Sequence, residues 1–509
     1  MAIIGNLLKR FVKVRKTIQD RLRKPSLEWQ QKELRDMLTK ARYTEFGRTY
    51  NFSQILKEPD LYKAFSERVH IYDYNSIFDN WWQKTVRGIP DVAWPGITPF
   101  FALTSGTSGS ASKRVPITPD MMKAMKKGSV RQILSIADLN LPEEVYQKRV
   151  LLLGGSTKLM RNAYGLYEGD LSGILAKKQP KWFAQFSKPG PTIASMTDWD
   201  SKIDEMVKRA PEWDIGIMVG VPAWGQILLE KIIAYHKLKS IHDIWPNLSI
   251  YVHSGVAFGP YVEAFKKLMG KEIYYIESYL ASEGLMAFQV QQERKTMQLF
   301  LDNGIFFEFV PFNEDNFTDE GNIKQTAKAI CINDVEEGID YALLITTCAG
   351  AWRYLIGDTV KFTSKEKFEI VITGRVKHFL SICGEHLSVD NMTQAITYVS
   401  SEMGIDIREF CVTGIPYNGM YAHKWYIGSD VALDKDRLII LLDNKLCEIN
   451  DDYRTERGPA IKEVMVEILP LQKFYDFIAY RGRKTAQSKF PRVIKGDLQR
   501  QWEMFLNKS

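Results

Sequence analysis

Short β-rich runs alternate with longer segments of helical periodicity after residue 90 of this 509-residue chain. In the longer segments, such as residues 121–139 and 224–238, apolar residues recur every three or four positions, as on one face of a helix. Strands that alternate with helices in this way form a sheet covered by helices, so the pattern predicts an α/β fold. The expected strands lie at residues 150–153, 215–219, 248–253 and 273–276.

Two flanking regions depart from this alternation. The first 100 residues have helical spacing and few turn signals, whereas residues 305–371 contain four β-rich runs broken by Asn, Asp and Gly turns. A compact βα pattern begins again after Gly374. A chain of this length is expected to form two or more domains. We therefore predict a large N-terminal domain (residues 1–374), with mixed β-sheets covered by helices and a β-rich subdomain, and a smaller α/β domain (residues 375–509).

Composition and charge indicate a globular protein with small-molecule ligands. Apolar residues make up 45% and charged residues 25% of the chain, both ordinary proportions. The 68 basic and 61 acidic residues give a net charge of +7, which suits an anionic small ligand, and we expect no nucleic-acid partner. The five cysteines contain no C-x-x-C pair, so they predict reduced thiols in a cytoplasmic protein rather than a zinc site.

The N-terminal segment has the pattern of a basic amphipathic helix. Apolar residues recur at helical spacing within residues 1–24, and Lys9 and Arg10 interrupt them early. No run in the chain approaches the roughly 18 uninterrupted apolar residues of a membrane span, so we predict no transmembrane segment. A basic amphipathic helix either packs on the body of its own protein, which we favour, or lies on a membrane surface.

Residues 98–118, TPFFALTSGTSGSASKRVPIT, have the features of a phosphate-binding loop. An apolar strand is expected at residues 100–103, and Thr118-Pro119 is a good helix start. Glycines allow successive backbone N–H groups to form an anion-binding nest, and hydroxyls and a lysine add further donors. No Gly-Lys-Ser/Thr ends the segment, so it is not a Walker loop, and a flexible surface loop is the alternative. The predicted phosphate ligands are Thr104, Ser105, Gly106, Thr107, Ser108 and Lys113.

This loop resembles the first nucleotide-binding motif of the acyl-adenylating superfamily, and in particular of the auxin-responsive Gretchen Hagen family of acyl-acid amido synthetases. The family pattern is T/S-S-G-T-S-G-G-x-x-K-x-x-P. Residues 104–109, Lys113 and Pro116 match it, while Ser110 replaces the second glycine of the Gly-Gly pair. The overall plan resembles the family from Gln30 to the C-terminus.

Further motifs follow in the order that the family shows. Residues 279–283, YLASE, resemble its Y-x-x-S-E, and residues 352–358, WRYLIGD, resemble its Y-R-Y-x-x-G-D with Trp in place of the first Tyr. Gly374-Arg375 matches the hinge signature of the superfamily. Residues 487–492, QSKFPR, resemble S-x-Y-K-x-P-R, with Ser488 in place of the tyrosine that precedes the lysine.

The resemblance implies the adenylate-forming architecture and an ATP- and Mg²⁺-dependent reaction. A carboxylic acid would be converted to its acyl-AMP, and the acyl group would then pass to an amine, with an amino acid as the expected donor of that amine. By resemblance, Glu283 binds Mg²⁺ and Asp358 binds the ribose. Lys489 reaches the phosphates and the substrate carboxylate when the small domain rotates about residues 375–377, as a mobile lid.

The remaining site residues also come from the resemblance. The nucleotide site would include Tyr279, Ser282, Tyr354 and Arg375, although either tyrosine could equally belong to the core. Ser254, Gly255 and Val256 would line the acyl and nucleotide pocket. His253 lies nearby, but a lone strand histidine is usually structural, and we assign it no catalytic role.

Two other functions remain open from the sequence. A thiol such as coenzyme A could replace the amine as acyl acceptor, because the first half-reaction would be the same. A non-catalytic, membrane-peripheral relative could also keep the fold. The presence of Lys113, Glu283, Asp358 and Lys489 counts against the second alternative.

Overall fold

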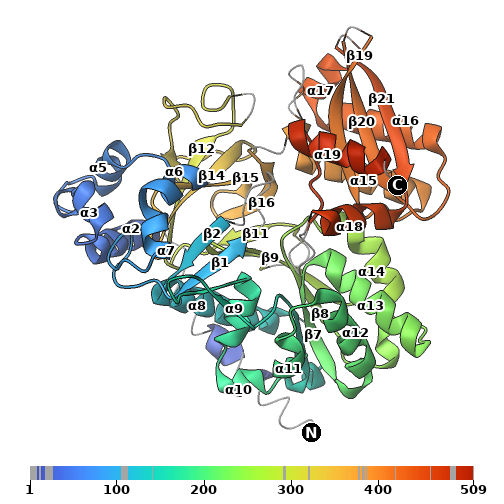
Figure 1. Cartoon of the computed structure of the whole chain (residues 1–509), viewed down its shortest axis with the longest axis horizontal. Helices are drawn as coiled ribbons and strands as arrows, with labels where there is room; N and C mark the ends of the chain where they lie inside the picture. The colour runs from blue at the N-terminus through green and yellow to red at the C-terminus, as the bar shows by residue number, and fades with distance from the viewer. Residues whose placement is uncertain are drawn as a thin grey trace.

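A long, mainly antiparallel sheet that continues into a parallel one forms the centre of the molecule in the computed structural model (Figure 1). The structure describes residues 9–10, 13–17, 27–104, 113–139, 141–290, 294–318, 321–376, 379–380, 385, 387–418, 420–458, 460–481 and 489–507. The strand order is β13 (Ile330–Cys331), β12 (Ile305–Pro311), β14 (Asp340–Thr347), β15 (Tyr354–Ser364), β16 (Glu369–Arg375), β11 (Met297–Leu299), β10 (Gly284–Phe288), β9 (Tyr274–Ala281), β8 (Ile250–His253), β7 (Ile215–Gly220), β3 (Arg149–Leu153) and β6 (Ser187–Lys188).

The predicted β-rich subdomain and the predicted helical N-terminal region pack on one another. Helices lie against the antiparallel half of the sheet, beginning with α2 (Leu27–Ala41), which contacts β12. The Gln30 amide on α2 donates hydrogen bonds to the carbonyl oxygens of Leu301 (2.8 Å) and Ile305 (3.0 Å), and it accepts one from the Phe307 N–H (2.8 Å). The other helices of this group are α3 (Glu45–Thr49), α4 (Phe52–Ile55), α5 (Leu61–Arg68), α6 (Tyr74–Ile77) and α7 (Gln83–Val86).

A buried ion pair joins the same two regions. Arg353 lies 2.9 Å from Glu308 of β12, and both side chains are almost fully buried. Arg353 also donates to the carbonyl oxygens of Ser66 (2.7 Å) and Val69 (2.8 Å) at the end of α5. A buried charge without partners is strongly destabilising, so these contacts hold Arg353 and the end of α5 together. The arginine of the WRYLIGD motif therefore has a structural role, because it holds these two regions together.

The strands β9, β8, β7, β3 and β6 are parallel, and helices cover one of their faces. The helices α12 (Trp199–Arg209), α13 (Pro222–His236) and α14 (Val262–Leu268) form a large core with that face. Helix α8 (Pro119–Ser135) and the segment after it lie by the other face, where the buried cluster is much smaller. α8 begins as expected, because the Thr118 hydroxyl accepts the Met121 N–H and Pro119 occupies the first turn.

The four strands predicted between residues 150 and 276 are confirmed, but the full extent of one strand and the presence of another were not predicted. The predicted strand at residues 273–276 extends to Ala281, so the YLA of the YLASE motif lies within β9 rather than after it. The phosphate loop does not lead directly into a helix. Instead β1 (Phe100–Thr104) pairs with an antiparallel strand β2 (Lys113–Ile117), with Thr104 opposite Lys113, before α8 begins. β1 and β2 belong to a small sheet with β5 (Tyr167–Gly169) and β4 (Met160–Arg161).

The C-terminal part has its own sheet and its own core. Strands β19 (Phe410–Tyr417), β20 (Met420–Gly428) and β21 (Ile461–Leu469) pack against α15 (Val389–Met403) and α16 (Lys435–Ile449) around Trp425. Helices α18 (Leu471–Tyr480) and α19 (Gly496–Asn507) form a second cluster around Trp502. The predicted α/β class, with a large N-terminal and a smaller C-terminal part, is confirmed. The boundary between residues 374 and 375 stays a prediction.

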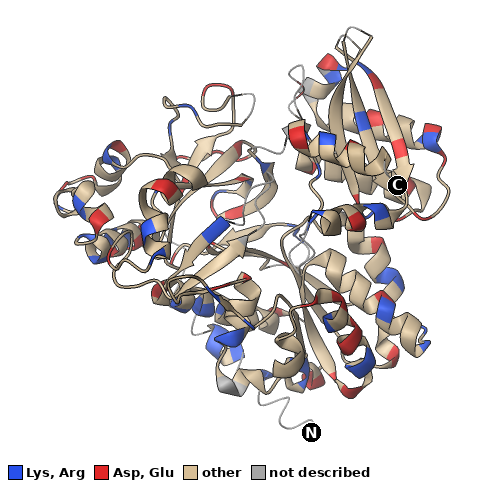
Figure 2. Cartoon of the chain, in the orientation of Figure 1, with Lys and Arg blue, Asp and Glu red and all other residues tan. Residues whose placement is uncertain are grey.

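The described part of the N-terminal segment is helical and contacts the body of the protein. The Lys9 ammonium donates to the Leu141 carbonyl oxygen (2.7 Å), and Lys16 lies 2.9 Å from Asp138. These contacts agree with the packing that we favoured for this segment. Within the described ranges, every helix is too short or too polar to cross a bilayer. Basic and acidic residues are interspersed over the helices in Figure 2, as the modest net charge leads one to expect.

Candidate active site

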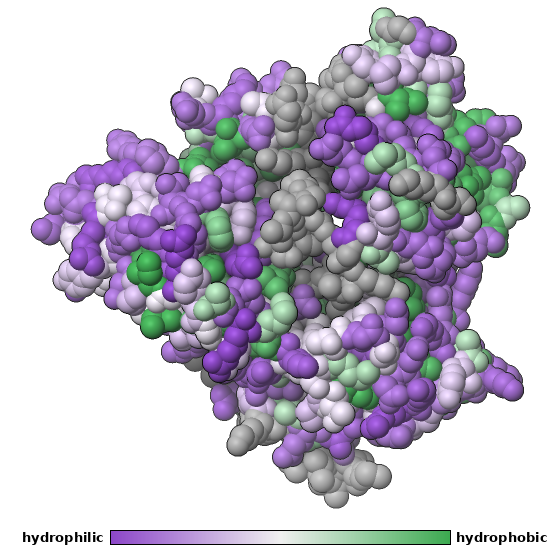
Figure 3. Space-filling model, in the orientation of Figure 1, coloured by the Kyte–Doolittle hydropathy of each residue, from purple (hydrophilic) through white to green (hydrophobic). Residues whose placement is uncertain are grey.

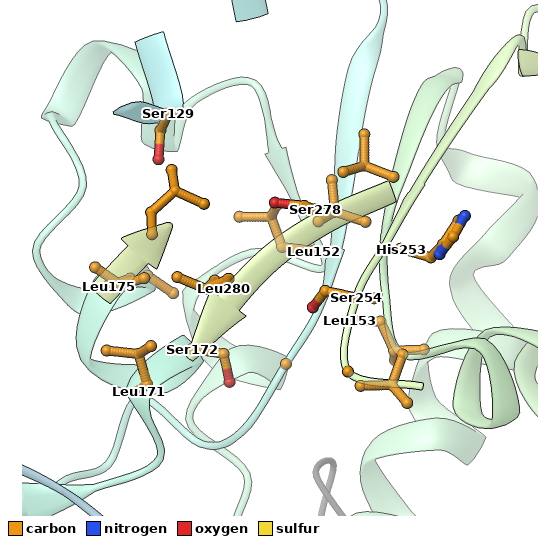
Figure 4. A pocket seen from close by; sticks show the side chains of 18 of the residues that line it. Ser129, Leu152, Leu153, Leu171, Ser172, Leu175, His253, Ser254, Ser278 and Leu280 are labelled. Atoms are coloured by element: carbon orange, nitrogen blue, oxygen red, sulfur yellow. The ribbon is translucent and has the colours of Figure 1, made fainter. Parts of the chain in front are cut away.

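A cavity of about 2270 Å³ opens along the large sheet and reaches the C-terminal part of the chain. Its walls include the ends of β8, β9, β15 and β16, the start of β2, and Lys489 and Phe490 from the C-terminal part. In Figure 4, Ser254 and Ser278 lie on its sheet side, and Leu171 and Leu175 lie on the wall that faces Leu280. The motifs that the sequence singled out therefore meet at one cavity.

Asp358 is the centre of a hydrogen-bonded cluster at this cavity. The Tyr279 hydroxyl donates to its Oδ2 (2.6 Å), and Arg375 Nε lies 2.9 Å from its Oδ1. The pairing of β15 with β16 places Asp358 and Arg375 opposite one another. A Gly-Asp pair is common in turns, but Gly357-Asp358 lies within β15, where Gly357 takes a positive φ of 93°. A carboxylate has about four acceptor positions, so Asp358 can still accept ligand hydroxyls.

Glu283 lies in a tight turn between β9 and β10, next to Ser282. Glu283 does not cap a helix, because the chain turns directly from β9 into a second strand. Burial raises the pKa of the Glu283 carboxyl, while the positive charges of Lys113 and Arg375 oppose this rise. Tyr354, which is buried, donates a hydrogen bond to Glu283. Because burial disfavours the charged form of this carboxyl, a bound cation would stabilise its carboxylate.

Lys489 reaches into the cavity from the C-terminal part of the chain. Its ammonium donates a hydrogen bond to the Gly255 carbonyl oxygen. The side chain contacts the solvent of the cavity, yet protein surrounds it, and this desolvation lowers the pKa of Lys489 to about 8. Arg375 lowers that pKa further, and Asp358 raises it. Gly255 has a φ of +90°, a backbone conformation that residues other than glycine rarely adopt.

The other predicted site residues are divided between the cavity and the part of the chain that is not described. Ser254 and Val256 flank Gly255 and line the cavity, as does Ser282. Lys113 also lines it, with its ammonium 4.9 Å from the centre of the Tyr74 ring. Thr104 ends β1, although its side chain is not described, and Ser105, Gly106, Thr107 and Ser108 lie outside the described residues. The phosphate-loop prediction therefore stays a prediction.

Sequence reasoning missed Glu277, which also lines the cavity. Burial raises the pKa of its carboxyl to about 7, so the group is partly protonated at neutral pH. Glu277 precedes Tyr279 by two positions on β9, and alternate residues of a strand share a face. That period would have found it, had the strand been predicted at its full length.

His253 lies beside Glu277 in the pairing of β8 with β9, and it also lines the cavity. Its ring stacks on Phe258, with centroids 4.3 Å apart. Burial lowers the pKa of His253 to about 3, so the imidazole is neutral. Its stacked, neutral ring agrees with our decision to assign it no catalytic role.

The residues at this cavity are compatible with a magnesium nucleotide. Mg²⁺ is usually held by one or two protein carboxylates together with phosphate oxygens and water. Glu283 supplies one such carboxylate beside Lys113. Within the described ranges no cluster of three His, Cys, Asp or Glu side chains gathers as a metal site.

Comparison with solved structures gives the class of protein that this fold defines. The chain superimposes on a GH3.15 acyl acid amido synthetase with a TM-score of 0.78 and 15% identity, over 98% of this chain and 96% of that one. It superimposes on a 2-hydroxyisobutyryl-CoA ligase, in the postadenylation state, with a TM-score of 0.59 and 13% identity, over 94% and 91% of the two chains. The fold is that of the adenylate-forming enzymes.

The family follows from the sequence models. The model of the GH3 family N-terminal domain matches residues 15–204 and 162–273, that of the central domain matches residues 298–374, and that of the C-terminal domain matches residues 390–497. The chain belongs to the GH3 family. This confirms the resemblance that the motifs carried.

The curated relatives are plant proteins and match over a part of their length. One is the indole-3-acetic acid-amido synthetase GH3.4 of Arabidopsis thaliana, 27% identical over 50% of this chain and 45% of that protein. Another is the probable indole-3-acetic acid-amido synthetase GH3.9 of Oryza sativa subsp. japonica, 28% identical over 50% of this chain and 62% of that protein. The matched region thus spans about half of the GH3.4 relative.

Proposed function

We propose that this protein uses ATP to convert a carboxylic acid to its acyl-AMP and then transfers the acyl group to the amine of an amino acid. The observation that carries the proposal is the convergence of Asp358, Glu283 and Lys489 on one cavity, although they come from three separate stretches of the chain. Membership of the GH3 family and the names of its amido synthetases support the same activity.

The nucleotide would lie across the ends of β9, β15 and β16. Asp358 would accept the ribose hydroxyls, and its bonds to Tyr279 and Arg375 fix the direction of its carboxylate. Glu277, on the same face of β9 as Tyr279, can accept a hydrogen bond from the amino group of the adenine. The loop after Thr104, together with Lys113, would hold the phosphates, since backbone N–H groups and an ammonium both favour anions.

In the first half-reaction, a carboxylate oxygen of the acid attacks the α-phosphorus while pyrophosphate leaves. Lys489 would stabilise the negative charge that grows on the phosphate oxygens, because a cation already in place costs no reorganisation in the transition state. When bound, Mg²⁺ supplies charge neutralisation to the leaving pyrophosphate, and Glu283 would hold it. Ser254, Gly255 and Val256 would border the reacting carboxyl group.

The second half-reaction needs room for the incoming amine where Lys489 lies. The residues after Gly374 would turn as a lid about residues 375–377 and carry Lys489 away from Gly255. Such a rotation separates the two half-reactions while the acyl-AMP stays shielded from water. A thiol acceptor is the second candidate, because the fold is shared with a CoA ligase.

The activity can be tested with purified protein, ATP, Mg²⁺ and pools of carboxylic acids. Pyrophosphate release that depends on an acid would demonstrate adenylation, and mass spectrometry after addition of amino acids or coenzyme A would identify the acceptor. Absence of acid-dependent pyrophosphate release from a folded, ATP-binding protein, across aryl and alkyl acids, would exclude the proposed reaction.

The lid can be tested by separating the half-reactions. Lys489→Ala should depress pyrophosphate release by roughly a hundredfold, the usual effect of removing one electrostatic catalyst. The same variant should consume separately supplied acyl-AMP and amine at nearly the wild-type rate. Equal impairment of both half-reactions, in a folded variant, would rule out a divided role for Lys489.

A further inference from the structure

The two faces of the parallel strands β3, β7, β8 and β9 differ in how completely they are covered. Side chains that point to the helices α12–α14 are fully buried, such as Leu151 (0% exposed) and Met218 (1%). Their neighbours that point the other way, such as Leu152, Val219 and Leu280, are only partly buried and line the cavity. Parallel sheets normally have both faces covered, so this apolar face lacks part of its cover.

Helix α8 presents a matching apolar stripe to the same cavity. Val130 and Ile133 of α8 line it and are 53% and 44% exposed, and Ile136, just after the end of α8, also lines it but is buried. Figure 4 shows Ser129 of α8 on one side of the space and Leu171 and Leu175 of α9 (Leu171–Lys177) on another, with Leu280 of β9 between them. The face of the molecule that Figure 3 shows is mostly hydrophilic, with smaller hydrophobic patches.

The aliphatic part of the cavity, which we call the acyl arm, is long. It runs along the sheet from Leu280 on β9 to Leu152 on β3, across three strand-to-strand spacings or about 14 Å. One leaflet of a bilayer's hydrocarbon core is about 15 Å thick. The whole cavity of about 2270 Å³ exceeds the roughly 300–1,000 Å³ of sites that hold one drug-sized ligand, so it has room for a nucleotide beside an acid in the arm. The arm therefore has the length of a membrane lipid's acyl chain.

The polar groups fix the direction in which an acid would enter. Lys202 lies by the end of β3, but its ammonium donates to the carbonyl oxygens of Gly154 (2.8 Å) and Gly155 (3.1 Å), which satisfies it. Glu283 follows β9, and Lys489 bonds to Gly255 just after the neighbouring strand β8, so both lie toward the β9 side of the cavity. A carboxylate therefore belongs at the β9 end, and the body of the acid extends toward β3.

We infer that the acyl arm takes one long, unbranched aliphatic chain, so that the acid substrate of this protein is a fatty acid. A compact aryl acid would cover the sheet near Ser278 and leave Val219 and Leu152 in water. A linear chain covers the whole face, and each buried methylene adds about 0.8 kcal/mol, equivalent to about a fourfold gain in affinity. This inference depends on the proposed function in one respect, namely that the carboxyl group of the bound acid is adenylated.

The chain-length dependence of the reaction tests the inference. The acids are butanoate, octanoate, dodecanoate and hexadecanoate, with benzoate and indole-3-acetate as aryl comparisons. We expect kcat/KM for pyrophosphate release to rise roughly twofold to fourfold for each added methylene from butanoate up to dodecanoate. Dodecanoate should exceed both aryl acids by at least a hundredfold. A flat series, or a preference for an aryl acid, would overturn the fatty-acid assignment while leaving adenylation intact.

A binding measurement without turnover separates this inference from the proposed function. Titration calorimetry with dodecanoate, octanoate and benzoate should rank affinity in that order, whether or not pyrophosphate is released. Binding of dodecanoate without any pyrophosphate release would refute the proposed function and support the acyl arm. Failure of dodecanoate to bind a protein that adenylates another acid would overturn the acyl arm.

A matched pair of variants tests where the aliphatic chain of the acid lies. Ile133→Trp adds bulk to the α8 stripe of the arm, and Ile440→Trp makes the same change at a 59% exposed position of α16, which does not line the cavity. Ile133→Trp should lower kcat/KM for hexadecanoate and dodecanoate by tenfold or more and leave butanoate unchanged, while Ile440→Trp changes none of them. An equal effect on all chain lengths, with circular dichroism unchanged, would contradict the placement.

Discussion

The two faces of the parallel strands β3, β7, β8 and β9 both carry mainly apolar side chains, but one face packs against helices and the other lines the cavity. On the face toward α12–α14, tryptophans and leucines pack together, and the Trp245 indole donates a hydrogen bond to the Ala210 carbonyl oxygen (2.9 Å). On the face toward the cavity, the same kinds of aliphatic residue stay partly exposed. The difference lies in what covers them: helices of the chain on one side, a space suited to a ligand on the other. An apolar strand residue thus stabilises the fold or binds a ligand according to its neighbours.

Two adjacent residues, one on each face, allow the stability of the two faces to be compared directly. Leu151→Ala removes a side chain from the packed face and should lower the free energy of unfolding by about 2–5 kcal/mol. Leu152→Ala removes the same atoms from the cavity face and should cost less than about 1 kcal/mol, because fewer packed neighbours lose contacts. Urea unfolding of both variants measures the difference. Equal losses would mean that the cavity face is ordinary core.

At the polar end of the cavity, a substitution should lower activity and leave stability unchanged, which is the opposite of what we expect on the packed face. Glu283→Gln should cut pyrophosphate release by roughly a hundredfold or more, as expected for an electrostatic group. It should not lower stability, because burial disfavours the carboxylate that the change removes. Glu212→Gln, an exposed change outside the cavity, is the control. Pyrophosphate release at the wild-type rate after Glu283→Gln would refute the assignment of the Mg²⁺ ligand.

A substitution of Asp358 should affect the KM for ATP more than kcat, because the contacts of Asp358 with the nucleotide would be present both before and during the reaction. Asp358→Ala should raise the KM for ATP by roughly tenfold, the effect of losing hydrogen bonds to a charged group, and should lower kcat less. Tyr279→Phe keeps the carboxylate, removes only its tyrosine partner and should have a smaller effect. Steady-state kinetics with ATP and with 2′,3′-dideoxy-ATP provide the measurement. If the wild-type protein used the two nucleotides with equal kinetics, the ribose contact would be wrong.

We also expect the rate of pyrophosphate release to depend on pH through Lys489, which lines the cavity. Because the pKa of Lys489 is lowered to about 8, its ammonium is complete well below that pH and is lost as the pH rises through 8. If the ammonium stabilises the transition state, kcat/KM for pyrophosphate release falls above that pH, by up to about tenfold per pH unit. Lys489→Arg should keep its charge and lose this limb. A limb that persists unchanged in the arginine variant would assign it to another group.

Much of the fold follows from local pattern. The alternation between residues 150 and 276 predicted the parallel strands, and Thr118-Pro119 predicted the start of α8. The strand β2 was missed because it has only five residues and its pattern, KRVPI, contains a proline. The full length of β9 was missed because Glu277 and Ser278 interrupt its apolar run. Both errors arise where pairing with a neighbouring strand outweighs local propensity.

The site was predictable where a motif carries the chemistry, and not where the fold alone brings distant residues together. Asp358, Glu283 and Lys489 were found from motifs, and they line one cavity. The aliphatic arm could not be predicted, since Leu152 and Leu280 resemble core residues in any sequence pattern. Glu277 was missed because β9 was predicted only as far as residue 276, so its alternation with Tyr279 was not recognised. Which apolar residues lack a cover is decided by tertiary packing alone.

The contacts between α2 and β12 have a consequence for the order in which the chain can acquire its structure. Gln30 leaves the ribosome about 270 residues before Leu301 and Ile305, its hydrogen-bonding partners. At roughly 5–20 residues per second, the N-terminal helices are on their own for about 14 to 55 seconds during synthesis. Throughout that interval the apolar side of α2 has no sheet to cover it. The helices that precede the sheet are therefore where a nascent polypeptide would have the greatest need of a chaperone.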